Sequence, residues 1–351
     1  MVGPRPIGAG GFLAWVGSHG LRWRLRRDGG FCRSSIRQSG VRAGKDAIHV
    51  VSDASTTAFE ARHDLPSDRL LEQGRRLVGF DRRFERLSGH MRLLSDLDGV
   101  STWAKRNHGG APDLVAALGD RYPLLVFHGD VGTGKTATAE AAADGLARML
   151  DTEGFLLKLS TRVRGIGHVG EMSTLIGDAF SEATKLAGRA RFVAMIVDEG
   201  DALAFNRAAE RAHHEDRVGV NALIQRIDEA RQLRGRLLII LCTNRFAALD
   251  PAVLRRAALR EEFQRPDDHE RHVLFEQVLA GVEVGKGVVD ELVNITGPRD
   301  ERPGFTFSDI QTRVVPEAVA RAYPERALTA EDLLVAAAEL EPTPEIREHE
   351  E

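Results

Sequence analysis

The sequence predicts an α/β fold in three layers, α/β/α, in which helices cover a parallel sheet and a small all-helical domain follows. Continuous apolar runs alternate with helical segments through the middle of the chain, as expected of strands that are buried on both faces. A glycine-rich turn joins the first of these runs to an alanine-rich segment. Beyond Pro266 the strand pattern stops and helical periodicity continues.

The expected elements follow from this apolar pattern in chain order. The expected strands are 124–127, 155–159, 192–197 and 237–242. Helices of the α/β domain are expected over 68–77 with Ser67 as its cap, from Asp81 to Leu97, and over 113–118, 136–150, 173–186 and 218–231. The C-terminal helices are expected over 267–279, 288–295, 307–320 and 329–340, and residues 107–112 are interpreted as a loop.

The 351 residues are enough for more than one domain, and we expect four segments. They are a basic, disordered leader over 1–65, an α/β domain over 66–265, an all-helical domain over 266–342 and a charged tail over 343–351. Residues 1–50 carry nine Lys and Arg against two Asp, a net charge of +7, which leaves −11 on the remainder. An acidic body argues against a general nucleic-acid binder.

The cysteine content and the hydropathy indicate a cytoplasmic protein without a membrane partner. Two cysteines, Cys32 and Cys242, provide no disulfide framework, and Cys242 is interpreted as a small core residue. No apolar segment is long enough to span a bilayer. The apolar stretch 7–16 is interrupted by glycine and lacks a small-residue cleavage site, which argues against a secretion signal.

Residues 129–136 read Gly-Asp-Val-Gly-Thr-Gly-Lys-Thr and fit the phosphate-loop pattern G-x-x-x-x-G-K-[ST]. Because an expected strand precedes the loop and an expected helix follows it, backbone N–H groups and the positive end of the helix point at one place. Such a place suits a polyphosphate. Lys135 would reach the β- and γ-phosphates, and the hydroxyl of Thr136 would bind Mg²⁺.

Polar side chains follow two further buried strands. Asp198 and Glu199 end one of them, and Asn244 follows another. The carboxylate of Asp198 would complete the Mg²⁺ shell begun by Thr136, whereas Glu199 would orient and polarise the attacking water. The amide of Asn244 would hydrogen-bond the γ-phosphate or that water.

Three arginines follow Asn244 in the sequence, namely Arg255, Arg256 and Arg260. A guanidinium supplied across a subunit boundary could stabilise charge on the transferring phosphoryl group. The alternative is a solvated helix face, in which these side chains carry no function.

Two other motifs have weaker support. Residues 165–170 read Gly-Ile-Gly-His-Val-Gly and fit the dinucleotide pattern G-x-G-x-x-G, but a lone match is weak. Residues 213–216 read His-His-Glu-Asp and have no second cluster at ligand spacing, so we interpret them as a solvated insertion.

The order of these parts resembles that of the AAA+ ATPases over roughly residues 70–340. Residues 129–136 correspond to the Walker A motif, VDEGDAL to Walker B and LCTNR to sensor 1, while VNALIQRID resembles the helix before sensor 1 and VGFD the segment beside the adenine. The resemblance implies ATP and Mg²⁺ as ligands and a hexameric ring that remodels another protein. The nucleotide-binding residues it implies are Gly79, Asp130, Val131, Gly132, Thr133, Gly134, Lys135, Thr136, Ala137 and Arg313.

Within that superfamily, residues 254–266 lack the R-P-G-R run of the proteasomal ATPases and are similar to the pachytene-checkpoint remodellers. That clade acts on HORMA-domain proteins and has bacterial relatives in CBASS anti-phage operons, so a HORMA-domain protein is the implied partner. Arg256 would be the arginine finger, and Arg313 would replace a sensor-2 arginine that is missing from residues 304–310. A loop containing Gly167, His168 and Val169 would face the pore and grip the substrate, unless it is a mobile surface loop.

Three other functions stay open from the sequence. One is another remodeller, such as a protease-associated unfoldase or a carboxylase activase. The second is a switch or scaffold that binds ATP and hydrolyses it slowly. The third is a nucleic-acid motor that works through the basic leader.

Overall fold

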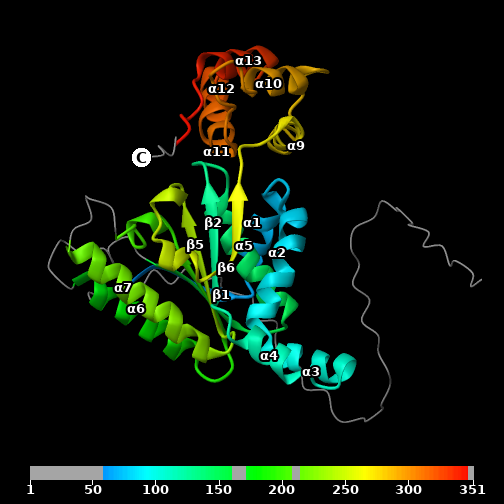
Figure 1. Cartoon of the computed structure of the whole chain (residues 1–351). Helices are drawn as coiled ribbons and strands as arrows, with labels where there is room; N and C mark the ends of the chain where they lie inside the picture. The colour runs from blue at the N-terminus through cyan, green and yellow to red at the C-terminus, as the bar shows by residue number, and fades with distance from the viewer. Residues whose placement is uncertain (1–57, 160–170, 208–213, 347–351) are drawn as a thin grey trace, which may run out of the picture. The chain divides into compact units, whose positions relative to one another are not determined.

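The computed structural model describes residues 58–159, 171–207 and 214–346, with the backbone alone for 214–216 (Figure 1). Within these ranges six strands form one sheet in the order β1-β3-β4-β5-β2-β6. Neighbouring strands are parallel, except that β1 is antiparallel to β3. The strands are β1 (Phe59–Leu65), β2 (Leu124–Gly129), β3 (Gly154–Leu159), β4 (Phe192–Val197), β5 (Leu237–Thr243) and β6 (Ala257–Phe263).

Helices pack on both faces of this sheet, which confirms the three-layer α/β/α architecture. Alternate residues of β2 enter separate cores: Leu124 and Val126 pack with α6 and α7, whereas Leu125 and Phe127 pack with α1, α2 and α5. The helices are α1 (Asp68–Arg76), α2 (Phe80–Ser95), α3 (Leu97–His108), α4 (Pro112–Gly119), α5 (Lys135–Met149), α6 (Glu171–Ala187), α7 (His214–Ala230) and α8 (Pro251–Leu254). Short 3₁₀ turns lie at Gly200–Ala202, Arg231–Leu233 and Phe246–Ala248.

The four expected strands are confirmed as β2 to β5, but the sheet also has two edge strands that the sequence reading missed. β1 lies in the segment assigned to the disordered leader, so that assignment is wrong for residues 59–65. β6 contains Arg260, for which the alternative of a helix face is therefore wrong, whereas Arg255 and Arg256 lie between α8 and β6. Both sequences, FEARHDL and AALREEF, are polar because an edge strand keeps much of its surface in solvent.

Two local expectations also need correction. The expected loop 107–112 shrinks to residues 109–111, because α3 ends at His108 with Gly109 in the left-handed conformation and α4 begins at Pro112. The expected helix 307–320 is interrupted by a π-helical turn over Ile310–Val314. Pro316 follows that turn and has no N–H to bond the carbonyl four residues earlier, so the regular ladder cannot pass through it.

A separate helical domain follows β6 and has its own hydrophobic core (Figure 1). Its helices are α9 (Asp268–Val278), α10 (Val288–Thr296), α11 (Phe307–Asp309), α12 (Val315–Ala322) and α13 (Ala330–Glu339). Buried side chains that include Phe275 and Phe305 fill the space between them. We call this domain the lid. Among the described residues, none of the helices combines the length and the hydropathy needed to cross a bilayer.

Candidate active site

The phosphate loop connects β2 to α5 at the carboxyl edge of the sheet. Its glycines permit close approach, since Gly129 has φ 130° and a Cβ there would lie 2.1 Å from the carbonyl oxygen of Phe263. Gly132 has φ 73°, and a Cβ there would lie 2.6 Å from the Thr306 hydroxyl of the lid. The lid therefore touches the loop directly, and the Ser308 N–H donates to the Gly132 carbonyl at 3.1 Å.

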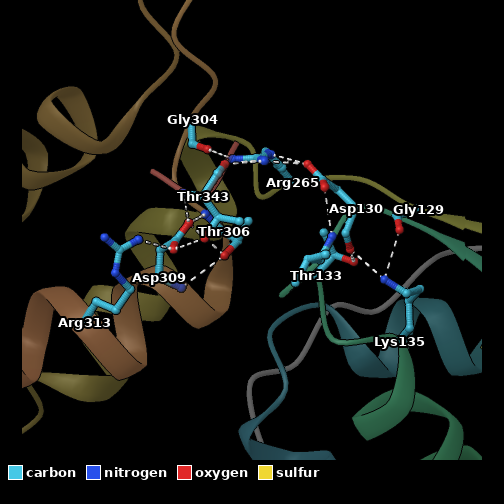
Figure 2. A network of polar contacts seen from close by, with 11 residues as sticks. Gly129, Asp130, Thr133, Lys135, Arg265, Gly304, Thr306, Asp309, Arg313 and Thr343 are labelled. Carbon is cyan, nitrogen blue, oxygen red and sulfur yellow. Dashed lines mark hydrogen bonds and ion pairs between the residues drawn. The ribbon is translucent and has the colours of Figure 1, made fainter. Parts of the chain in front are cut away.

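Lys135, the first residue of α5, is 7% exposed, and its ammonium lies within the loop. The Nζ donates to the carbonyl oxygens of Gly129 at 3.0 Å and Asp130 at 2.6 Å (Figure 2). Burial lowers the pKa of Lys135, while the nearby charges of Asp130 and Asp198 oppose that shift. The loop thus holds a cation at its centre, where a phosphate group can be neutralised.

The expected metal ligands lie side by side. The Thr136 hydroxyl donates to Asp198 Oδ2 at 2.9 Å, and Lys158 Nζ lies 3.5 Å from the same oxygen. A hydroxyl and a carboxylate are hard oxygen donors, which suit Mg²⁺ when water and phosphate oxygens complete the shell. Thr136 and Asp198 therefore fit the metal that the phosphate-loop pattern implies.

Glu199 follows Asp198 in a left-handed conformation with φ 49° and ψ 46°. This backbone is costly for a residue with a side chain, by about 1 kcal/mol or more, so neighbouring contacts must enforce it. A Cβ on the next residue, Gly200, would lie 2.3 Å from Leu241 Cδ2, so any larger residue there would have to displace the buried Leu241 side chain. The turn leaves Glu199 exposed, and its carboxylate has no hydrogen-bond partner among the described residues. It is available to orient a water molecule.

Strand register brings the third group to the same edge. His128 of β2 pairs with Thr243 of β5, so Asn244 stands beside the start of the phosphate loop. Val197 of β4 pairs with Leu241 of β5, which places Asp198 on the other side. Asn244 is half-buried and lines a cleft together with Asp130. Adjacent parallel strands thus assemble the predicted site from segments far apart in the chain.

A second cleft, of about 210 Å³, lies between the phosphate loop, the segment before α2 and the lid. Its lining includes Gly132, Thr133, Gly134 and Ala137 of the loop and α5. Val78 and Leu274 contribute apolar surface of the kind an adenine ring prefers. Gly79 adjoins Val78 and has φ 72°, which gives it the sharp turn that starts α2.

The structure does not bring Arg313 to that cleft. Its guanidinium bonds Asp309 Oδ1 at 2.9 Å and lies on the far side of Asp309 from Lys135 (Figure 2). The sequence reading missed Arg83, which does line the cleft and stacks over Phe263 at 4.2 Å. Arg83 stands one helical turn after Gly79, and its N–H bonds the Gly79 carbonyl. That spacing from a predicted nucleotide-binding residue is the sequence signal that could have identified it.

Arg256 is held within its own chain. Its guanidinium forms a two-pronged ion pair with Asp228, in which Nη2 donates to Oδ2 at 2.9 Å, and Nη1 donates to the Ala252 carbonyl at 2.9 Å. The Asp228 hydrogen bond raises the pKa of Arg256. Arg255 beside it is exposed, and its guanidinium has no hydrogen-bond or ion-pair partner among the described residues. The role of Arg256 as a finger stays a prediction.

Other predictions have different outcomes. Gly167, His168 and Val169, and with them the G-x-G-x-x-G match, lie outside the described residues. The side chains of 213–216 also lie outside them, and the described part holds no cluster of three metal-binding side chains. Cys242 is buried, which confirms its assignment to the core, and burial raises the pKa of its thiol.

Known proteins share this arrangement. The family described as "ATPase family associated with various cellular activities (AAA)" matches residues 125–266. CD-NTase-associated protein 6 of Escherichia coli strain KTE188 is 44% identical over 292 residues, which cover 83% of this chain and 98% of that protein. A chain in "Structure of E. coli MS115-1 HORMA:CdnC:Trip13 complex" is 42% identical with a TM-score of 0.77, covering 82% and 97% of the two chains. "Structure of Rhizobiales Trip13" is 36% identical with a TM-score of 0.63, covering 82% and 99%.

The fold and the site therefore define an AAA ATPase. More narrowly, the chain belongs to the family of CD-NTase-associated protein 6, to which it is similar over nearly the whole length of the relative.

Proposed function

We propose that this chain forms a hexameric ring that hydrolyses ATP with Mg²⁺ and uses the cycle to remodel a HORMA-domain protein in a bacterial anti-phage system. The observation that carries the ATPase part is the convergence of Lys135, Asp198, Glu199 and Asn244 at one edge of the sheet. The family match supports the same activity.

Each side chain has a distinct role in the proposed hydrolysis. The loop amides and Lys135 would bind the phosphates, and Thr136 with Asp198 would hold the Mg²⁺ that neutralises their charge. Glu199 would accept a proton from the attacking water, and Asn244 would align that water with the γ-phosphate. Arg256 would act in the site of the neighbouring copy, and Arg313 would contact nucleotide only after the lid moves.

The proposed partner rests on the relatives. The structure described with HORMA, CdnC and Trip13 contains a chain that is 42% identical to this one, and the match covers 82% of this chain and 97% of that chain. A HORMA-domain protein from the same gene neighbourhood is therefore the favoured substrate, gripped by the pore loop that contains His168. The proposed compartment is the cytoplasm, whose reducing conditions suit the free thiol of Cys242.

One experiment tests partner and activity together. The full-length protein is assayed for ATP turnover alone, with the neighbouring HORMA-domain protein and with casein, and Glu199→Gln is used to trap the bound partner. The HORMA-domain protein alone should stimulate turnover and copurify with the trap variant in ATP. Stimulation by casein would indicate a general unfoldase. Slow turnover that no protein changes would indicate a switch or scaffold.

A further inference from the structure

A nearly buried arginine joins three segments at the junction of the α/β domain and the lid (Figure 2). Arg265 is 11% exposed along its side chain and lies two residues after β6. Its Nε donates to Asp130 Oδ2 at 2.6 Å, its Nη1 to the Gly304 carbonyl at 2.6 Å and its Nη2 to the Thr343 carbonyl at 2.7 Å. One planar guanidinium therefore fixes the phosphate loop, the lid and the C-terminal segment.

Thr343 is held from its other side by Asp309, which is 2% exposed. The Thr343 hydroxyl donates to Asp309 Oδ1 at 2.6 Å and its N–H to Oδ2 at 3.1 Å. Burial by itself would raise the pKa of Asp309, but hydrogen bonds from Thr343, Thr306 and Arg313 lower it below its ordinary value. Asp309 is thus charged at neutral pH, and it locks Thr343 in place for Arg265.

The contact of Arg265 with Asp130 is linked through Asp130 to Lys135 of the phosphate loop. The Asp130 carboxylate is engaged by Arg265 and by the Val131 N–H, which bonds Oδ1 at 2.9 Å. The carbonyl of the same residue accepts from Lys135 Nζ at 2.6 Å and from the Thr133 hydroxyl at 2.8 Å. An arginine that fixes the side chain of Asp130 therefore also fixes the carbonyl that places Lys135.

A purely structural ion pair is the competing explanation. Buried ion pairs contribute little net stability, since desolvation offsets most of their attraction. The position of the Arg265–Asp130 pair argues for a role beyond stability. Its carboxylate belongs to the phosphate loop, and its guanidinium precedes Pro266, where the chain enters the lid. The lid also bonds the loop at Gly132 through Ser308.

We propose that Arg265 is a positioning residue for nucleotide binding, which acts through Asp130 on Lys135 and makes the affinity depend on the docking of Thr343. Nucleotide affinity then requires the lid and the C-terminal segment in place, although neither carries the phosphate loop. This inference rests on the ATPase activity proposed above.

The test compares full-length variants by nucleotide affinity, kinetics and thermal unfolding. The probe is a fluorescent ATP analogue with Mg²⁺. Arg265→Gln and Asp130→Asn should each raise Kd and KM about tenfold while kcat stays within about twofold. The double variant should bind the probe no more weakly than the weaker-binding single variant, since both substitutions break the same Arg265–Asp130 contact. Arg265→Lys keeps the positive charge but lacks the planar guanidinium, so its affinity for the probe should fall about threefold. Thr343→Val should lower that affinity about twofold.

Arg326→Gln is the matched control. It removes an ion pair with Asp332 inside the lid that does not reach the phosphate loop, so it should lower Tm and leave Kd unchanged. If Arg265→Gln and Arg265→Lys behave as Arg326→Gln does, Arg265 only stabilises the fold and the inference is overturned. If wild type binds the probe no better than Lys135→Ala, the proposed ATPase function fails instead.

Discussion

Thr136 Oγ1 lies 2.9 Å from Asp198 Oδ2, although 62 residues separate them in the sequence. The contact joins the first turn of α5 to the end of β4, two strands away from β2 across the sheet. It is the arrangement from which the catalytic predictions start, because it places both oxygen donors where Mg²⁺ would bind.

Changing one of these ligands should weaken the binding of Mg²⁺ and not only the binding of nucleotide. We expect Asp198→Asn and Thr136→Ala to raise the Mg²⁺ concentration for half-maximal turnover by about tenfold or more, because the first loses the negative charge of the ligand and the second loses the ligand oxygen. Thr136→Ser keeps the hydroxyl and is the matched control. Chelation of Mg²⁺ should abolish turnover. Equal Mg²⁺ dependence of all three variants would refute the site.

Glu199→Gln should lower kcat by about 10²- to 10⁴-fold while ATP binding persists, because an amide cannot accept the proton of water. Phosphate release and binding of the fluorescent analogue measure the two effects separately. Glu182→Gln, on the exposed face of α6, removes a carboxylate away from the site and should match wild type. Unchanged turnover in Glu199→Gln would mean that another group activates the water.

The finger hypothesis predicts different effects for the two members of one ion pair. Arg256→Ala should lower turnover about 10³-fold, whereas Asp228→Asn should stay within about threefold, because the guanidinium must leave Asp228 to reach a neighbour. Mixing Arg256→Ala with Glu199→Gln protomers should restore part of the activity, and Arg255→Ala is the control. Similar losses in Arg256→Ala and Asp228→Asn would instead indicate a structural pair within one chain.

The low pKa of Asp309 gives a pH-dependent contribution to stability. Its folded-state pKa lies below the ordinary 3.8, so the charged form stabilises the native state above that value and the benefit is lost as pH falls through the folded pKa. Urea unfolding should show Asp309→Asn less stable by about 1–3 kcal/mol near pH 7. The difference should shrink below pH 3.8. A constant difference down to pH 2 would contradict the assignment.

Two deletions distinguish the leader from the sheet. Removal of residues 1–57 should leave ATPase activity within about twofold, because the site residues all lie beyond it. Removal of residues 1–65 also deletes β1 and uncovers the edge of β3, so we expect a lower Tm and aggregation. Thermal unfolding and turnover of both forms provide the check. A collapse of activity in the shorter deletion would show a catalytic role for the leader.

The sequence predicts the buried half of the fold well because burial on both faces demands apolar residues. Strands β2 to β5 and their helices follow from runs such as 237–242. The edge strands β1 and β6 have no such constraint, and both of them contain a run of three polar residues, RHD in β1 and REE in β6. Their pairing partners lie between 89 and 134 residues away, which no local pattern records.

The site shows the same division. Lys135, Thr136, Asp198 and Glu199 could be predicted because each stands in a local motif beside a strand. The contacts of Arg265 could not, since they join residues separated by 135, 39 and 78 positions. Long-range polar contacts depend on the packing of whole elements, and a single sequence does not display them.

β6 connects the proposed arginine finger to the junction between the α/β domain and the lid. Arg256 precedes this strand and Arg265 follows it, and the seven extended residues between Ala257 and Phe263 span about 20 Å. Its backbone pairs with that of β2, so β6 is a rigid connection and not a flexible linker. In the proposed ring, with Arg256 at the proposed subunit boundary, a displacement there would therefore reach the lid junction of the same copy and mechanically couple neighbouring copies.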